Sequence, residues 1–556
     1  MSFKKDLAKY SPRKEQSETI EFINTEWNRN PLTKFFLLNL PTGVGKSHLA
    51  LMIVDWYRKN VNKVARADVI TNSKILQDQY SSLYESICNL KGKENYECES
   101  YSSSCGQGME FSRLNKTKCE SCPFVNSRES FMSGGIGLTN FYLYTLYAMY
   151  NQKMLREVRD ARILIVDECH DLDDVVSNFI SIKLTESIIK KYKFAREDEI
   201  IRDIKAVTTI PSYISLLNSL GQDIENTLES MSLSMSSIKR SKTSDVRSNK
   251  ISIITKSKNS DMKTMELISS LSQLKMKIEI FIKEYSDNPN NWILEQTYNE
   301  KLRQKELSLE PIWAYDYLDK YIFSHYDMVF LMSGTILDKN LFCQLNGLDV
   351  SKSIYYSIPS PFKAENRPII YMPLGKMSYK TKDETFKRYI PYIEKILEKY
   401  KDKKGIIHTN SFELSNWIKK SITNSRLIFH DSSNKDEMLQ LHFNSDEPSV
   451  IVSPSVDTGV SFDDDLARFQ IIAKVPYPSL ASNKNKMRMN NNPDWYSYKT
   501  VSGLIQMLGR PIRSIDDHSD TIILDGSFGD IIKYSNSFIP EWIQDAIRRV
   551  NVKIEN

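Results

Sequence analysis

The fold of this chain is decided by residues 35–54, which read FFLLNLPTGVGKSHLALMIV. The first six residues are an apolar run, the next seven hold two glycines, and the remainder has the spacing of a helix. This order predicts a buried strand, a phosphate-binding loop and a helix whose N-terminus faces the phosphates. Gly43 and Gly45 would let backbone amides wrap phosphate oxygens, Lys46 would supply a cation, and Ser47 would bind Mg2+. The nucleotide contacts expected from this loop are Thr42, Gly43, Val44, Gly45, Lys46 and Ser47.

The loop by itself has a simpler interpretation, a glycine-rich turn that caps a helix. The strict phosphate-loop pattern also has glycine where Leu40 stands. A second motif favours the nucleotide site: the aliphatic run 163–166 ends in Asp167 and Glu168. Catalytic groups gather where parallel strands end, so we assign Asp167 to the metal and Glu168 to the proton acceptor for water.

Further short apolar runs predict an α/β fold with parallel sheets. Expected strands before the middle of the chain are 67–71, 136–140 and 162–167, and later ones are 328–332, 405–409, 449–453 and 521–525. Between about 174 and 309 this pattern gives way to helical spacing, with apolar residues at Leu267, Leu271, Leu274, Ile278 and Phe281. We therefore expect two α/β domains with an all-helical insertion in the first.

Length and composition are those of a multidomain protein without a membrane segment. The chain has 556 residues, of which 40% are apolar and 26% charged, and single domains usually have roughly 100 to 200 residues. No apolar run approaches the ~18 residues that a membrane span needs, and the N-terminus reads MSFKKD without an apolar signal segment. We expect a cytoplasmic protein, in which disulfides are rare. The net charge of +5 argues only weakly for a polyanionic partner.

Four of the seven cysteines lie together between the two nucleotide motifs: Cys98, Cys105, Cys119 and Cys122. Four thiolates can hold either zinc or an iron–sulfur cluster, and a C-x-x-C pair such as Cys119 and Cys122 occurs in both kinds of site. The ligands alone leave that choice open.

A pair of arginines lies far along the chain, in the second α/β domain, within the segment QMLGRPIR at residues 506–513. Arg510 and Arg513 are three residues apart and could face one anion from a second domain, as arginine fingers do. An isolated arginine pair is usually a surface feature, so this assignment depends on the other motifs.

Taken in order, the motifs resemble those of superfamily 2 helicases. They are Arg13-x-x-Gln16, the phosphate loop, DECH at 167–170, SGT at 333–335 and QxxGRxxR at 506–513. With the four cysteines, the chain resembles the XPD/DinG family of iron–sulfur helicases. The segments LKGKENYEC at 90–98, CPF at 122–124 and TNF at 139–141 look like the two ends of the DinG cluster domain.

This resemblance implies a role for each matching residue. Gln16, with Arg13 nearby, would recognise adenine, Ser333 and Thr335 would couple hydrolysis to strand movement, and Gln506 with the two arginines would sense the γ-phosphate. The metal ligands would be Cys98, Cys105, Cys119 and Cys122 for a [4Fe-4S] cluster, with zinc as the alternative, and Ser47 and Asp167 for Mg2+.

The family's fold implies two RecA-like motor domains with an iron–sulfur insertion and a helical arch in the first. The expected boundaries are 1–87, 126–174 and 311–336 for the first motor domain, 88–125 for the cluster domain, 175–310 for the arch and 337–556 for the second motor domain. The implied activity is that of an ATP-dependent, 5′-to-3′ DNA helicase acting on single strands and tailed duplexes as a monomer.

One departure from the family leaves other functions open. Family members usually have Glu-Gly-Val/Ile-Asp where this chain has TGVS at 458–461, with Asp457 before it. A nucleic-acid-binding clamp or scaffold that uses ATP only as an ordering ligand is one alternative. A helicase for RNA or RNA–DNA hybrids is another alternative, because such enzymes bind the nucleic-acid backbone more than the bases.

Overall fold

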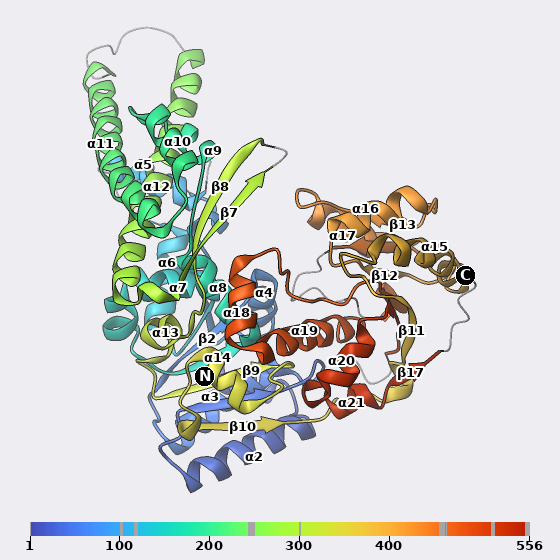
Figure 1. The fold of residues 1–556 in the computed structure, drawn as a ribbon. Helices are drawn as coiled ribbons and strands as arrows, with labels where there is room; N and C mark the ends of the chain where they lie inside the picture. Colours follow the sequence, from blue (N-terminus) through green and yellow to red (C-terminus); the bar gives the residue numbers. More distant parts are fainter. Residues whose placement is uncertain are drawn as a thin grey trace.

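Two parallel β-sheets, each flanked by helices, form the body of the molecule, and a long helical projection rises from the first (Figure 1). The computed structural model describes residues 2–99, 104–115, 121–242, 251–299, 302–454, 462, 464–512 and 517–550. The α/β class predicted from the sequence is therefore confirmed.

The first sheet has seven parallel strands in the order β10-β1-β9-β5-β2-β4-β3. Its strands are β1 (Phe35–Asn39), β2 (Arg66–Thr71), β3 (Ile87–Asn89), β4 (Ile136–Asn140), β5 (Ala161–Asp167), β9 (Met328–Ser333) and β10 (Ser353–Ser357). The helices of this part are α1 (Ser2–Ala8), α2 (Lys14–Arg29), α3 (Lys46–Asn60), α4 (Lys74–Leu83), α7 (Phe141–Tyr150), α8 (Leu172–Ile180), α13 (Tyr315–Tyr317) and α14 (Lys339–Asn346). Strands β1 and β9 are buried along their whole length, as expected for a parallel sheet covered on both faces.

The second sheet also has seven parallel strands, in the order β13-β14-β12-β15-β16-β11-β17. Its strands are β11 (Ile369–Gly375), β12 (Gly405–His408), β13 (Leu427–Phe429), β14 (Val450–Ser453), β15 (Phe469–Ile472), β16 (Asp520–Asp525) and β17 (Ile547–Arg549). Its helices are α15 (Lys382–Lys399), α16 (Phe412–Ser421), α17 (Lys435–Asn444), α18 (Asn483–Asn491), α19 (Pro493–Leu508), α20 (Phe528–Tyr534) and α21 (Glu541–Gln544).

The boundary between the two α/β domains lies later than predicted. Strand β10 pairs with β1 in the first sheet, from Phe35 with Ser353 to Asn39 with Ser357. The expected boundary at 336/337 is therefore wrong by about one strand, because a short strand at a sheet edge has too weak a pattern to be recognised in the sequence.

The insertion is not all-helical, which corrects the prediction for residues 175–310. It contains α9 (Glu186–Tyr192), α10 (Glu197–Ala206), α11 (Ile210–Lys242) and α12 (Ile251–Asp287). It also contains the antiparallel sheet β6-β8-β7, formed by β6 (Ile182–Thr185), β7 (Trp292–Asn299) and β8 (Gln304–Pro311). The strands are partly exposed and mix apolar with polar residues, so they lack the continuous apolar run by which the core strands are recognised.

The predicted apolar seam of the insertion is confirmed. Leu271, Ile278 and Phe281 of α12 are buried, with Leu267 and Leu274 packed against the same core. Figure 1 shows α11 and α12 side by side along the projection. Among the described residues, no helix is both long enough and apolar enough to cross a membrane.

The second domain contains a buried histidine that should make it sensitive to acid. His442 on α17 is fully buried, and its imidazole lies 2.9 Å from both the Leu466 carbonyl and the Ser449 hydroxyl. Burial lowers the pKa of His442 to about 4. Because the unfolded chain takes up this proton near pH 6.5 and the folded chain does not, stability falls as the pH drops from 6.5 towards 4.

We predict that His442 removes about 1 kcal/mol of stability between pH 7.5 and 5.5. Urea midpoints at the two pH values would measure this loss. His442→Gln should lower stability at both pH values but reduce the difference between them, whereas His518→Gln, at an exposed position of the same domain, should leave the difference unchanged. An equal pH dependence in wild type and His442→Gln would contradict the assignment.

Candidate functional site

The polar motifs of the first domain meet at the carboxyl ends of three neighbouring strands. Strand β9 lies between β1 and β5, so Ser333 at its end stands between the phosphate loop and Asp167. In doubly wound sheets ligands bind at this edge. The sequence prediction that the phosphate loop and the acidic pair form one site agrees with this topology.

The phosphate loop has the left-handed backbone that its glycines permit. Gly43 and Gly45 have φ values of 86° and 83°, which other residues rarely adopt. The Arg13 guanidinium donates to the Gly43 carbonyl, and the Gln16 amide donates to the carbonyls of Val44 and Gly45, each at 3.0 Å. A Cβ at position 45 would lie 2.6 Å from Gln16 Nε2. Arg13 and Gln16 therefore support the loop, while adenine recognition by Gln16 stays a prediction.

Lys46 and Glu168 form an ion pair across the nucleotide site. Lys46 Nζ lies 2.5 Å from Glu168 Oε1, and the two side chains are only 12% and 16% exposed. Glu168 has a left-handed backbone, with φ 57° and ψ 46°, an uncommon conformation for glutamate that is often found at functional sites. The turn aims the carboxylate back at the phosphate loop instead of along the next helix.

Asp167 is buried beside the residue expected to share Mg2+ with it. Its carboxylate accepts hydrogen bonds from the Tyr80 hydroxyl, at 3.0 Å, and the Glu168 amide, at 3.1 Å. The Ser47 side chain lies close to the Tyr80 hydroxyl as well. Burial and the neighbouring Glu168 raise the pKa of Asp167 to about 6, although Lys46 opposes the rise. Tyr80 thus holds one predicted Mg2+ ligand, Asp167, and lies beside the other, Ser47, a role that its sequence context did not reveal.

A chain of hydrogen bonds leads from this site towards the second domain. His170 Nδ1 lies 2.9 Å from Ser333 Oγ and 3.4 Å from Glu168 Oε2. Ser333 Oγ is 2.9 Å from Thr335 Oγ1, and the Tyr498 hydroxyl on α19 donates to the Thr335 carbonyl at 2.8 Å. The sequence predicted a coupling role for Ser333 and Thr335, and the structure places them on a connection between the two sheets.

The far end of α19 reaches the phosphate loop. A Cβ at Gly509 would lie 3.5 Å from Thr42 Oγ1, so the second domain closes directly over the loop. Arg510 is buried at this end, close enough that its charge adds to burial in lowering the pKa of His408 to about 3. Gln506 is half-buried one turn earlier. Arg513 lies outside the described residues, as do Asp457 and the departing segment 458–461.

Three of the four predicted metal-binding cysteines converge in the first domain. Cys98, Cys105 and Cys122 are buried, and the sulfurs of Cys105 and Cys122 are 3.8 Å apart. Cys105 begins α5 (Cys105–Asn115), and Cys122 directly precedes α6 (Pro123–Ser133). Burial raises the pKa of the Cys105 thiol to about 11. Cys119 lies outside the described residues, and among those described no group of three or more His, Cys, Asp or Glu side chains forms a metal site.

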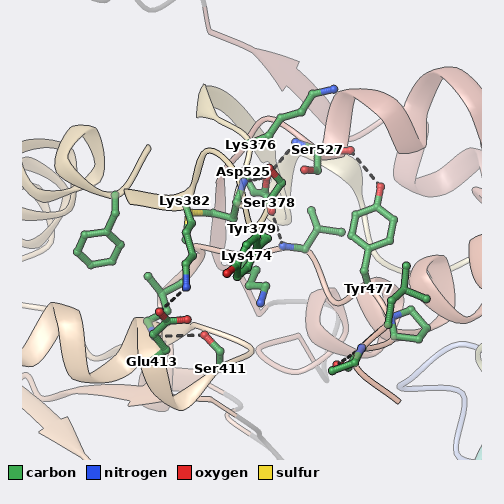
Figure 2. Close-up of a pocket in the computed structure, with 18 of the residues that line it drawn as sticks. Lys376, Ser378, Tyr379, Lys382, Ser411, Glu413, Lys474, Tyr477, Asp525 and Ser527 are labelled. Atoms are coloured by element: carbon green, nitrogen blue, oxygen red, sulfur yellow. Dashed lines mark hydrogen bonds and ion pairs between the residues drawn. The ribbon is translucent and has the colours of Figure 1, made fainter. Parts of the chain in front are cut away.

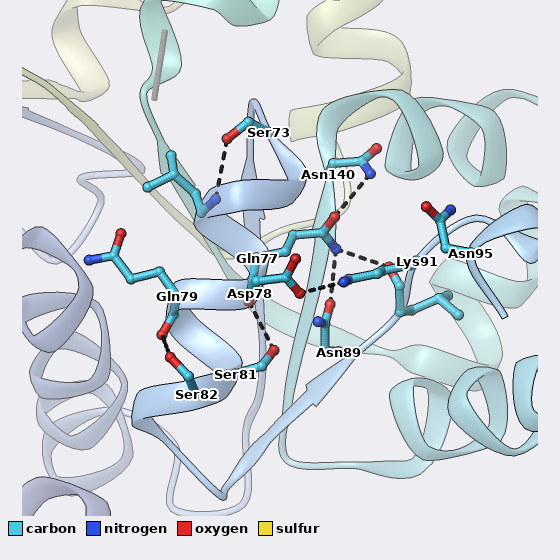
Figure 3. Close-up of polar contacts among 12 residues, drawn as sticks. Ser73, Gln77, Asp78, Gln79, Ser81, Ser82, Asn89, Lys91, Asn95 and Asn140 are labelled. Atoms are coloured by element: carbon cyan, nitrogen blue, oxygen red, sulfur yellow. Dashed lines mark hydrogen bonds and ion pairs between the residues drawn. The ribbon is translucent and has the colours of Figure 1, made fainter. Parts of the chain in front are cut away.

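The strand that leads into the cysteine segment is fixed by a buried glutamine (Figure 3). Gln77 Nε2 donates to Asn89 Oδ1 at 2.9 Å and to the Leu90 carbonyl at 3.1 Å, and Gln77 Oε1 accepts from Asn140 at 3.1 Å. Thr139 also donates to the Leu90 carbonyl. These bonds hold the two ends of the cysteine segment, after β3 and at β4, on the first sheet.

The two domains are joined by a buried cation that sequence reasoning missed. Arg488 of α18 is 1% exposed, and its guanidinium lies 3.1 Å from Asp173 and 3.6 Å from Asp174, just after the DECH motif. It also lies over the rings of Trp313 and Trp495, 5.0 and 5.6 Å from their centroids. Nothing in the charged sequence around Arg488 distinguishes it from a solvated lysine or arginine.

A second cation on the same helix face strengthens this contact. Lys484, four residues before Arg488, is buried against Ser177 of α8 and lies 3.6 Å from Glu310 of β8. The Lys484 amide donates to Glu295 of β7 at 2.8 Å. Helix α18 therefore contacts both the segment behind the acidic motif and the antiparallel sheet of the insertion.

Two family models match separate parts of the chain. A model described as a type III restriction enzyme, res subunit, matches residues 9–195, and a helicase C-terminal domain model matches residues 393–546. The first match covers the phosphate loop and the acidic pair, and the second covers Gln506 and Arg510. The two halves of the site thus fall in the two matched regions.

Comparison with individual proteins agrees with these matches. The ATP-dependent DNA helicase CHL1 of Vanderwaltozyma polyspora is 25% identical over 166 residues, which cover 25% of this chain and 19% of that protein. The solved structures named XPD_APO and XPD_Helicase each superpose with a TM-score of 0.61 at 15% identity, over 97% of this chain and 100% of theirs. The S. tokodaii Xpd4 structure gives a TM-score of 0.57 at 12% identity with the same coverage. At these levels of sequence identity, the similarity to the solved structures shows a shared fold.

We predict that Arg488→Met weakens the contact between the domains, because it leaves Asp173 buried without its cation at a cost of about 3 kcal/mol. Hydrogen–deuterium exchange should become faster in α8 and β7–β8, with β1 and α3 unchanged. Lys486→Met, at an exposed position on the same helix, is the matched control. Equal exchange in the two variants would show that Arg488 does not hold the domains together.

Proposed function

Since its motifs, family matches and fold make the chain an XPD/DinG-like superfamily 2 helicase, we propose that it moves 5′ to 3′ on single-stranded DNA and separates duplexes with ATP. The observation that carries this proposal is the approach of Gly509 to Thr42, which brings the segment of Arg510 from one domain to the phosphate loop of the other. A nucleotide bound there would contact both domains, so its hydrolysis would change how they fit together.

In the proposed cycle, ATP changes the partner of Lys46. The γ-phosphate offers Lys46 stronger acceptors than the carboxylate that it contacts in this structure. Lys46 would then bind phosphate, and Glu168 would be released to accept a proton from the attacking water. The ion pair keeps both groups in place before the nucleotide arrives, so little reorganisation is needed.

Asp167 and Ser47 would hold Mg2+, whose charge offsets that on the β- and γ-phosphates when it is bound. Burial already disfavours a lone charge on Asp167, and a divalent cation would remove that penalty. Tyr80 orients Asp167 through its hydroxyl. The donor set of a carboxylate and a hydroxyl suits Mg2+.

Arg510, with Gln506 and Arg513, would bind the γ-phosphate from the second domain. Loss of that phosphate would remove their shared ligand and let the domains part. His170, Ser333, Thr335 and Tyr498 would transmit the change, because hydrogen bonds run from His170 to α19 and His170 lies 3.4 Å from the Glu168 carboxylate.

We further propose that the four cysteines bind an inorganic centre, with [4Fe-4S] implied by the family. Buried, neighbouring thiols at Cys98, Cys105 and Cys122 fit such a group. Zinc stays the alternative, because four thiolates can hold either centre.

Two other functions are separated from the helicase by simple measurements. A clamp that uses ATP as an ordering ligand would bind DNA without turnover stimulated by single strands. A helicase for RNA or hybrids would unwind tailed RNA substrates faster than tailed DNA. The altered segment 458–461 is the reason to make both comparisons.

Unwinding of 5′-tailed and 3′-tailed duplexes tests the main proposal. Wild type should unwind the 5′-tailed DNA, Lys46→Ala should lose ATP turnover at least ~100-fold, and Glu168→Gln should bind ATP and DNA but not hydrolyse. Preference for 3′ tails would overturn the polarity. Normal turnover in Glu168→Gln would overturn the assignment of the proton acceptor.

We predict that protein purified without oxygen is brown, with iron and sulfide near four per chain, because thiolate-bound iron–sulfur centres absorb visible light. Cys105→Ser should bleach it and impair unwinding more than ATP turnover, whereas Cys343→Ser, at a buried thiol outside the group, should stay brown. Colourless protein with one zinc per chain would establish the alternative.

A further inference from the structure

A short connector, residues 358–362, begins the passage from the first sheet to the second. It leaves β10 at the edge of the first sheet, and the chain then enters β11 in the second. Pro359 and Pro361 hold their own φ angles at about −65° and restrict the residues before them, Ile358 and Ser360. Every connector residue except the last is therefore constrained, so the connector is stiff.

Asn39 fastens the first end of the connector to the first sheet. It is the last residue of β1 and is 8% exposed. Its side-chain amide donates to Ser357 Oγ at 3.0 Å, and its main-chain carbonyl accepts from the Ile358 amide at 3.2 Å. Its side-chain oxygen accepts from the Ile336 amide at 3.2 Å, directly after the SGT motif. One asparagine thus joins the connector, the strand before the phosphate loop and the SGT segment.

The SGT segment is in turn packed tightly on the phosphate loop. The Leu40 amide donates to the Ser333 carbonyl at 2.8 Å, and a Cβ at Gly334 would lie 3.3 Å from the Leu40 carbonyl. On the other side, the Tyr355 hydroxyl of β10 donates to the Ile336 carbonyl at 2.9 Å. Because such dense packing leaves no free space, a shift of Ile336 must also shift the entry to the phosphate loop.

Arg367 fastens the far end of the connector to the second domain. Its guanidinium donates to the Phe362 carbonyl from Nε at 3.1 Å and from Nη2 at 3.0 Å. It also donates to the Trp542 carbonyl at 2.7 Å and lies over the Trp542 ring, 4.5 Å from its centroid. The last connector residue is therefore held by the C-terminal part of the second domain.

The strand that follows the connector is fixed within the second sheet. Strand β11 lies between β16 and β17. At its carboxyl end, Asp525 of β16 accepts hydrogen bonds from three backbone amides, those of Met377, Val475 and Ser527 (Figure 2). A movement of the second sheet therefore carries β11 and the far end of the connector with it.

A cavity of about 480 Å3 beside the connector leaves it room to tilt. The cavity is lined by Asn39 and Tyr355 from the first domain, by Trp542 from the second and by Pro359 and Ser360 of the connector. A stiff segment beside such a cavity can change its angle without displacing densely packed side chains.

We propose that Asn39 and the connector form a second link between the domains, which transmits movement of the second domain to the SGT motif and the phosphate loop. Asn39 acts through the backbone of Ile336 and through β1, so it is a positioning residue. The proposal rests on the proposed helicase function, because DNA binding and ATP hydrolysis produce the movement that is transmitted.

A double-mutant cycle tests whether Asn39 and the connector act as one link. Asn39→Leu removes the side-chain hydrogen bonds with a similar shape, and Pro359→Gly with Pro361→Gly makes the connector flexible. Each change should lower the stimulation of ATP turnover by single-stranded DNA about tenfold, equivalent to about 1.4 kcal/mol. The KM for ATP should stay nearly constant. The combined variant should lose no more than either change alone, because a flexible connector no longer pulls on Asn39.

Asn39→Asp keeps acceptors for the Ile336 amide and the Ser357 hydroxyl, so it should restore most of the stimulation. Matched controls are Leu38→Val on the same strand and Pro448→Gly in the second domain outside the connector, which should retain it. Additive losses in the combined variant, or an Asn39→Asp variant as impaired as Asn39→Leu, would overturn the proposal. Parallel losses of stability and of turnover without DNA would show that Asn39 has only a structural role.

Hydrogen exchange of the Ile336 amide provides a measurement that needs no DNA. A non-hydrolysable ATP analogue should change this exchange rate in wild type but not in the glycine variant, in which the connector is flexible. An equal response in both proteins, or none in wild type, would show that the connector transmits nothing. Absence of DNA-stimulated turnover in wild type, with the exchange response present, would refute the helicase function and leave the link in place.

Discussion

The buried guanidinium of Arg488 is the interaction on which the arrangement of the two domains depends. Removing an arginine from water is costly unless anions and polarisable rings replace the water. Here the carboxylates of Asp173 and Asp174 and the rings of Trp313 and Trp495 replace the water around the guanidinium. Of these residues only Trp495 belongs to the second domain. The geometry of the nucleotide site follows, because the same helix pair carries Gln506 and Arg510 towards the phosphate loop.

Within the first domain, the strand order of the parallel sheet determines where the functional residues lie. Strands β1, β9 and β5 end side by side, so Lys46, Ser333 and Glu168 meet although they are far apart in sequence. The sequence could therefore predict the first half of the site, since each motif directly follows a buried aliphatic strand with a clear pattern. The class of fold and most core strands were predictable for the same reason.

Other parts could not be predicted, for separate physical reasons. Strand β10 and the sheet β6-β8-β7 are short or half-exposed, so they lack a continuous apolar run. Tyr80 and Tyr498 act through hydroxyl groups whose partners lie more than 80 residues away in sequence. Arg488 and Lys484 sit in a polar helix whose buried face becomes evident only when the two domains are docked.

The docking of α18 also suggests how the nucleotide site and the insertion communicate. Helix α18 touches α8, which follows the acidic motif, and through Glu295 and Glu310 it touches β7 and β8 of the insertion. A change in the fit of the second domain must then act on both contacts together, because buried charges with fixed partners do not slide gradually. Movement of the second domain would therefore act on α8 and on the insertion at the same time.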